Sequence, residues 1–95
     1  MTNLQLLAGS LSNDLFRVAS LTQRGSMKAA LRFLKEAKRW SAPLQQQEAA
    51  EYIVKIAKDV SDKTPNDISL SEAEKYLMCG VLLQNYALHL GKAKS

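Results

Sequence analysis

Apolar residues recur every three or four positions along most of this chain, in four stretches separated by short breaks. That spacing places them on one face of an α-helix, whereas a half-buried β-strand needs alternation at every second position. Period-two alternation is confined to the short segment Ile68–Leu70. With only two prolines and four glycines in 95 residues, little interrupts the helical pattern. The sequence therefore predicts an all-α protein.

The chain length sets the number of domains. Ninety-five residues form one domain and can bury a core without a metal or disulfide if the helices pack well. A hydrophobic fraction of 46% and a charged fraction of 23% are typical of globular proteins and not of disordered ones. Four helical stretches joined by short connections predict a single four-helix bundle that occupies residues 1–95.

The first predicted helix begins at Thr2, whose hydroxyl can cap it, and ends at Gly25. Ser10 or Ser12 offers an alternative start, which would leave a short arm before the helix. One helix is favoured, with residues 1–10 as soft first turns. Its buried stripe contains Leu4, Leu7, Leu11, Leu15, Val18 and Thr22.

Ser26 is the predicted N-cap of the second helix, which runs to about Trp40 or Ser41. Pro43 separates this helix from the third, because proline disfavours helical geometry in the preceding residue yet fits the first turn of a new helix. The buried stripe of the third helix contains Ala49, Ile53, Ile56 and Val60.

The longest predicted loop runs from Asp62 to Leu70. Two overlapping capping boxes, Ser69-x-x-Glu72 and Ser71-x-x-Glu74, open the fourth helix. Gly91 is the expected end of that helix, and residues 92–95 are expected to form a frayed tail.

The fourth helix is apolar on nearly every side, which indicates burial on more than one side. We therefore expect it to be central in the bundle or shared with another chain. Met78 and Leu82 point away from the main apolar face, so they are candidate residues for a homo-oligomer interface. The residues predicted for the main face are Ala73, Leu77, Gly80, Val81 and Leu88, with Tyr76, Leu83, Ala87 and Leu90 widening it.

Charge is distributed unevenly along the chain. The net charge is +6 from Arg17 to Arg39 and −4 from Trp40 to Glu74. At about 100° per residue, four cations of the second helix fall within a strip roughly 60° wide. Like charges one turn apart destabilise a helix, so they favour a counter-charge from the acidic half of the chain or from a partner. We call these four residues the basic stripe: Lys28, Arg32, Lys35 and Arg39.

The basic stripe has two interpretations. It can be the solvent-facing side of an amphipathic helix, or it can bind an acidic protein or a nucleic-acid backbone. Nucleic acid is not favoured as the partner, because no aromatic residue lies on the helix face that carries the cations, where it could stack on bases. Phe33 and Trp40 lie on the apolar margin of the same helix. They are expected to pack in the core, with a half-exposed pair that anchors a partner as the alternative.

No catalytic constellation is visible in the sequence. The single His89 lies in the last turn of the last helix, and the single Cys79 has apolar neighbours on both sides and is expected to be a small buried hydrophobic residue. The carboxylates are explained as helix caps and solvated faces, and no phosphate-binding glycine loop occurs. We therefore expect no enzymatic activity, no cofactor and no metal.

The sequence also bears on location. A lone cysteine fits a reducing compartment, and no export signal is visible. The longest apolar run, Tyr76 to Leu83, is far shorter than the about 20 residues of a membrane span. We expect a cytoplasmic, non-enzymatic protein-interaction or regulatory module, with homodimerisation through the fourth helix as one form of it. The alternatives are a nucleic-acid-associated protein and a small subunit of a larger complex.

Overall fold

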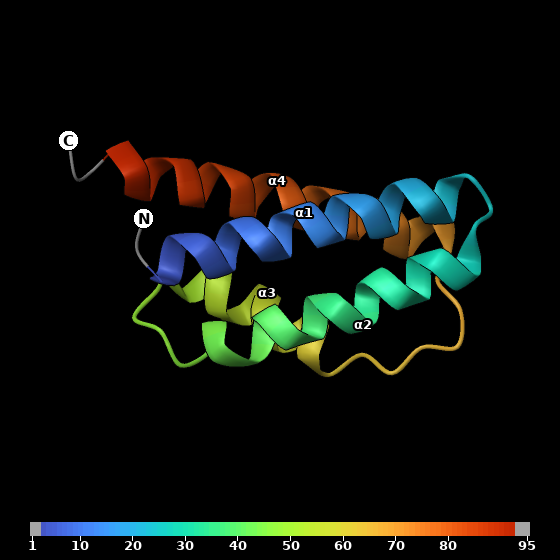
Figure 1. The fold of residues 1–95 in the computed structure, drawn as a ribbon, viewed down its shortest axis with the longest axis horizontal. Helices are drawn as coiled ribbons and strands as arrows, with labels where there is room; N and C mark the ends of the chain where they lie inside the picture. Colours follow the sequence, from blue (N-terminus) through green and yellow to red (C-terminus); the bar gives the residue numbers. More distant parts are fainter. Residues whose placement is uncertain (1–2, 93–95) are drawn as a thin grey trace.

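The computed structural model describes residues 3–92, and it confirms the all-α four-helix bundle (Figure 1). Within these residues there is no β-strand. The predicted cap at Thr2 and the end of the predicted tail, residues 93–95, lie outside the described residues. The helices are α1 (Asn3–Gln23), α2 (Met27–Leu44), α3 (Glu51–Ser61) and α4 (Leu70–Lys92).

Helix α1 lies between α4 and α2 and packs on both, whereas α3 packs mainly on α2. In Figure 1, α1 and α4 lie side by side in one layer, and α2 and α3 form the layer below. The α1–α4 and α1–α2 pairs contact each other extensively, whereas the short α3 barely touches α4. The helix with two long neighbours is therefore α1. Of the two alternatives expected for α4, the central position was wrong, and a helix shared with another chain stays a prediction; α4 leaves one side of its surface uncovered.

Helix α1 is continuous, as favoured. Ser12 does not cap a second helix; its hydroxyl is buried and donates a hydrogen bond of 2.6 Å to the carbonyl of Gly80 on α4. The helix ends at Gly25 as predicted, with a φ of 81°. The amides of Ser26 and Gly25 donate to the carbonyls of Leu21 and Thr22, which satisfies the last turn in a Schellman motif. Glycine suits this position because it adopts positive φ without strain.

The prediction that Pro43 separates α2 from α3 was wrong. Pro43 lies inside the last turn of α2, and α3 begins only at Glu51. A proline near a helix end costs one backbone hydrogen bond, the one its missing amide would donate. Helical geometry through Leu44 buries that side chain completely, which offsets the loss. The amide of Ala50, just before α3, donates to the hydroxyl of Tyr86 on α4 at 3.1 Å.

The start of α4 confirms one of the two capping boxes. The amide of Glu72 donates to the hydroxyl of Ser69 at 3.0 Å, and the amide of Ser69 donates to the Glu72 carboxylate at 3.1 Å. This hydrogen bond from Ser69 lowers the pKa of Glu72. Ser71 lies within the first turn instead of capping it. The prediction that Gly91 ends α4 was wrong, because the helix continues through Lys92 and glycine can also adopt helical backbone geometry.

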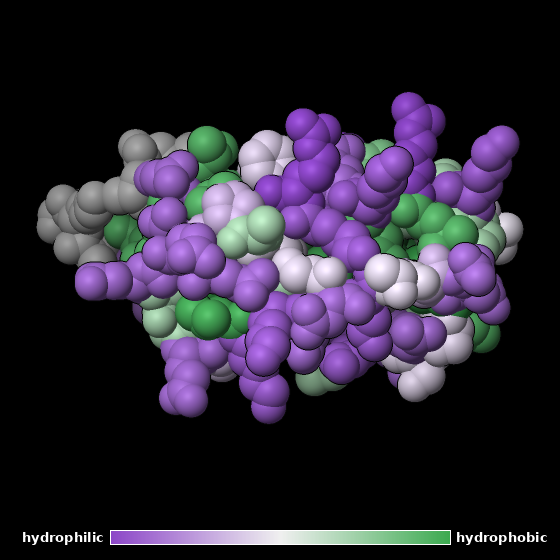
Figure 2. Space-filling model, turned by 90° about the horizontal axis from the view of Figure 1, so that it is seen from below, coloured by the Kyte–Doolittle hydropathy of each residue, from purple (hydrophilic) through white to green (hydrophobic). Residues whose placement is uncertain are grey.

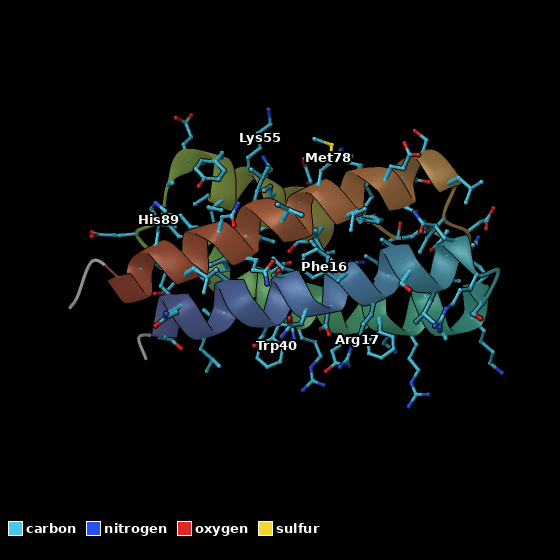
Figure 3. The ribbon with its side chains drawn as sticks, turned by 90° about the horizontal axis from the view of Figure 1, so that it is seen from above. Phe16, Arg17, Trp40, Lys55, Met78 and His89 are labelled. Atoms are coloured by element: carbon cyan, nitrogen blue, oxygen red, sulfur yellow. The ribbon has the colours of Figure 1, made fainter. Side chains whose placement is uncertain are left out.

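The buried face of α4 differs from the predicted one. Leu77, Val81 and Leu88 are exposed. Small side chains at every seventh position allow α1 to approach closely, and a Cβ added at Gly80 would lie only 3.0 Å from the ring of Phe16 (Figure 3). The helix therefore turns its small residues toward α1, and several of its large ones point outward. The residues that α4 buries are Ala73, Tyr76, Gly80, Leu83 and Ala87.

Candidate functional site

The basic stripe lies on the side of α2 opposite the core. All four of its cations are exposed, as the periodicity predicts. The core side of the same helix is contributed by small and aliphatic residues packed against its neighbours, so the stripe faces solvent along the length of the helix. The buried residues of α2 are Ala30, Leu34, Ala37, Ser41 and Leu44.

No acidic side chain among residues 3–92 forms an ion pair with the basic stripe; in that part of the chain the ion pair present joins Lys63 to Glu72 at 3.9 Å. Glu36 is four residues from Arg32 and three from Arg39 on the same helix, yet it forms no ion pair with either. The acidic half of the chain therefore does not neutralise the stripe through direct contacts. Its counter-charge comes from solvent ions or from a partner.

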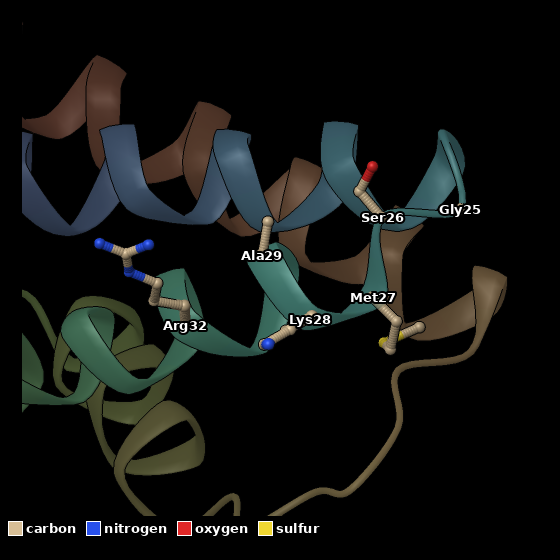
Figure 4. Close-up of a pocket in the computed structure, with 6 residues that line it drawn as sticks. All are labelled: Gly25, Ser26, Met27, Lys28, Ala29 and Arg32. Atoms are coloured by element: carbon tan, nitrogen blue, oxygen red, sulfur yellow. The ribbon is translucent and has the colours of Figure 1, made fainter.

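Two surface hollows adjoin the basic stripe. The first, of about 540 Å³, lies where α2 begins, between Gly25 and Arg32, and includes Lys28 (Figure 4). The predicted N-cap Ser26 stands at this start, but its hydroxyl makes no capping hydrogen bond. The second hollow is lined by Lys35 and Lys38 of α2 and by Lys63 of the loop between α3 and α4. Lys63 was missed because it is distant in sequence. Figure 2 shows that this side of the molecule is mostly hydrophilic, with small apolar areas between the charged groups.

Phe33 and Trp40 face α1, away from the basic stripe. The indole Nε1–H of Trp40 donates to a carboxylate oxygen of Asp14 at 3.0 Å. The guanidinium carbon of Arg17 lies 5.2 Å from the centre of the Phe33 ring, a cation–π contact. Both aromatic side chains are half-buried and have partners within the chain. The structure thus places Phe33 and Trp40 in the interface between α1 and α2.

Asp14 is a buried carboxylate that the sequence analysis missed. Only 6% of its surface is exposed. Burial and, secondarily, the negative charge of Glu36 raise the pKa of Asp14, while the Trp40 hydrogen bond and Arg17 oppose that shift. The available signal was its position, three residues after Leu11 and four before Val18 on the apolar stripe of α1. Its contacts make Asp14 a structural group joining α1 to α2.

A second candidate site lies on the uncovered side of α4. Six large apolar residues there have 42 to 67% of their surface exposed, and Figure 3 shows Met78 extending from α4 away from α1. Of these six residues, sequence analysis assigned only Met78 and Leu82 to an interface. It missed the others because an almost wholly apolar helix does not show by periodicity which side is buried. We call this surface the outer face of α4: Leu70, Leu77, Met78, Val81, Leu82 and Leu88.

The two residues with the greatest catalytic potential are not brought together. His89 is exposed on α4 and borders a hollow with Tyr52 of α3. Cys79 is half-buried and free, and its pKa is raised by burial, with Lys75 opposing and Asp59 adding to the shift. A raised pKa makes the thiol a weak nucleophile at neutral pH. No cluster of three or more His, Cys, Asp or Glu side chains that could hold a metal occurs within residues 3–92.

Across the described helices, none has both the length and the hydrophobicity of a membrane span. No protein-family model matches the chain, and neither the curated proteins nor the solved structures include a match to it.

Proposed function

We propose that this protein is a non-enzymatic interaction module that binds a protein partner through the outer face of α4. The observation that carries the proposal is the exposure of six large apolar side chains on one helix. Among the described residues, only Leu6 and Tyr52 are comparably exposed large apolar residues elsewhere. Large apolar side chains exposed together on one helix are typical of interaction sites, because a partner that covers them removes apolar surface from water.

The outer face is held on a well-anchored helix. Gln5 of α1 donates a hydrogen bond from Nε2 to the carbonyl of Ala87 at 3.0 Å, and Ser12 donates to the carbonyl of Gly80. These contacts lie near the end and the middle of α4. A partner therefore meets a preformed surface and does not have to order this helix, which lowers the entropic cost of binding.

A photo-cross-linking amino acid at Val81, expressed in cells of the native host, tests the proposal. We expect covalent protein adducts from position 81, and none from the control position Ala42, an exposed residue of α2. Leu88→Glu in the same chain should abolish the adducts, because a charge opposes burial of that position. Equal labelling at both positions, or none at position 81, would contradict the proposal.

The basic stripe supports a second candidate function, recognition of an anionic partner. Its four cations are exposed and lack acidic partners among residues 3–92. An acidic protein is favoured over nucleic acid, because Phe33 and Trp40 are committed to α1 and cannot stack on bases. Both the outer face of α4 and the basic stripe are also compatible with a role as a small subunit of a larger cytoplasmic complex.

Replacing all four stripe residues with glutamine tests this second function. A bound acidic protein should be lost from a pull-down, and nuclease treatment should leave the wild-type result unchanged. We expect no measurable affinity for DNA or RNA at physiological salt. A sub-micromolar dissociation constant for DNA or RNA at physiological salt, with an affinity that decreases steeply as salt is added, would instead support the nucleic-acid alternative.

A further inference from the structure

We propose that the partner of the outer face of α4 is a second copy of this chain, whose α4 packs antiparallel to the first around a two-fold axis level with residue 79. This inference rests on the proposed function, since it names the occupant of the same surface. It follows from the spacing, chemistry and exposure of the residues along α4.

The exposed side of α4 carries a coiled-coil seam. Its positions are separated by four, three, four, three and four residues, the spacing at which one helix packs along another. Four of the six are exposed apolar residues, and the two polar ones are also exposed. The seam consists of Leu70, Glu74, Leu77, Val81, Gln84 and Leu88.

The seam is complementary to itself. In a two-fold dimer the same surface is used by both copies, so each residue must suit the one that it meets. With the axis level with residue 79, apolar residues meet apolar residues, and the Gln84 amide can donate a hydrogen bond to the Glu74 carboxylate of the other copy. The pairs, one residue from each copy, are Leu70 with Leu88, Glu74 with Gln84, and Leu77 with Val81.

The neighbouring arrangements do not match in this way. Moving the axis half a heptad toward the start of α4 places Glu74 opposite Leu77, and moving it the other way places Val81 opposite Gln84. A parallel, in-register pair places the two Glu74 carboxylates opposite each other. Antiparallel helices also oppose their dipoles favourably. The register centred on residue 79 is the one that avoids all these mismatches.

The seam separates the two residues that the sequence analysis grouped together. Met78 borders the seam close to the axis, so the Met78 side chains of the two copies come near each other. Leu82 lies about 100° around the helix from Val81, beyond the edge of the seam. Val81 and Leu82 are adjacent and nearly equally exposed, at 43% and 44%. They are therefore a matched pair for testing whether the seam, or exposed apolar surface in general, causes association.

The contact is small. Residues 70–88 span about 27 Å at a rise of about 1.5 Å per residue, and a helix is about 10 Å wide. Such a strip covers about 270 Å², which is smaller than the about 800 Å² per partner of a standard interface. We therefore expect a dimer with a dissociation constant in the micromolar range.

Sedimentation equilibrium on the full chain measures this association. At high micromolar concentration we expect twice the 10.5 kDa mass of one chain. Val81→Glu should give monomers, because its dissociation constant should be at least tenfold larger than that of the wild type. Leu82→Glu should retain the dimer. Circular dichroism will show that both variants stay helical, as their exposure allows. Equal loss of the dimer in both variants would overturn the proposal that the seam forms the dimer interface.

Disulfide cross-linking tests the direction of the helices, in a Cys79→Ser background. Chains with Leu70→Cys mixed with chains with Leu88→Cys should form a disulfide-linked dimer on mild oxidation, and neither variant alone should do so. Cross-linking of Leu88→Cys with itself would indicate parallel helices and overturn the register.

Failure of this inference is distinguishable from failure of the proposed function. A monomeric wild-type chain that still gives Val81 adducts to other proteins in cells overturns the dimer and leaves the interaction module intact. A monomeric chain that gives no adducts overturns both.

Discussion

The buried Ser12 hydroxyl donates a hydrogen bond of 2.6 Å to the carbonyl of Gly80, and so ties the middle of α1 to the middle of α4. The two helices approach closely at this point because Ser12 and Gly80 are both small. The ring of Phe16 lies beside the same glycine and fills the remaining space. This contact orients α4 and thereby decides which of its apolar residues remain exposed.

Ser12→Ala should lower the free energy of unfolding by about 1 kcal/mol, because it removes one buried hydrogen bond. Urea denaturation will measure the change. Ser20→Ala, at an exposed position of the same helix, is the control and should have little effect. Equal effects of the two substitutions would show that the Ser12 contact does not contribute.

Gly80→Leu should destabilise the fold by about 1–3 kcal/mol, because the new side chain overlaps the ring of Phe16. Thermal or urea unfolding of the single and double variants forms a double-mutant cycle with Phe16→Ala. We expect Phe16→Ala to cost less stability in the Gly80→Leu background than in the wild type. Simple additivity of the two changes would refute the packing explanation.

Asp14→Asn should change the dependence of stability on pH. The pKa of Asp14 is raised in the folded state above its ordinary value of 3.8, chiefly by burial. The folded protein therefore takes up a proton before the unfolded chain does as pH falls, so the contribution of Asp14 to stability is complete below 3.8 and is lost as pH rises through the folded pKa.

The Asn variant, whose amide oxygen can still accept the Trp40 hydrogen bond, lacks this titration. The free energy of unfolding of Asp14→Asn relative to that of the wild type should thus be highest at pH 7 and should decrease progressively toward pH 4. Denaturation of both proteins at several pH values will measure the difference. A stability difference that does not change with pH would show that Asp14 is not perturbed.

Tyr76→Phe should leave stability unchanged or raise it by about 1 kcal/mol. The Tyr76 hydroxyl is buried and has no hydrogen-bond partner among the described residues, and burial raises its pKa to about 12. Removing a buried, unpaired polar group removes its desolvation cost while the ring keeps its packing. Tyr86→Phe is the contrasting variant, since its hydroxyl accepts the Ala50 amide, and it should be destabilising. The opposite order in a urea titration would contradict this assignment.

Features governed by local chemistry could be predicted from the sequence. The end of α1 at Gly25, the capping box of Ser69 and Glu72, and the exposure of the basic stripe depend on residues within one or two turns. The path through Pro43 could not be predicted, because local geometry opposes it and the burial of Leu44 by distant residues favours it.

The outer face of α4 was predicted only in part for a related reason. Its residues are apolar on nearly every side, so periodicity alone does not identify the side that packs. The informative signal was the recurrence of small residues at Ala73, Gly80 and Ala87, which allows another helix to approach closely. The Asp14–Trp40 pair likewise depends on two helices meeting, and neither residue indicates the other in the sequence.

The pairing of α1 with α4 also bears on how this bundle is made during translation. The residues joined by the Ser12–Gly80 contact are separated by 68 positions, so the ribosome must complete α2, α3 and most of α4 before α1 acquires its main neighbour. Until then the α4-facing side of α1 remains uncovered, and only α2 can shield the helix. Closing so long a segment costs more chain entropy than joining adjacent helices does. The α1–α2 hairpin, held by the turn at Gly25, is therefore the part of the bundle that can form first on the nascent chain, and docking of α4 is the step that completes it.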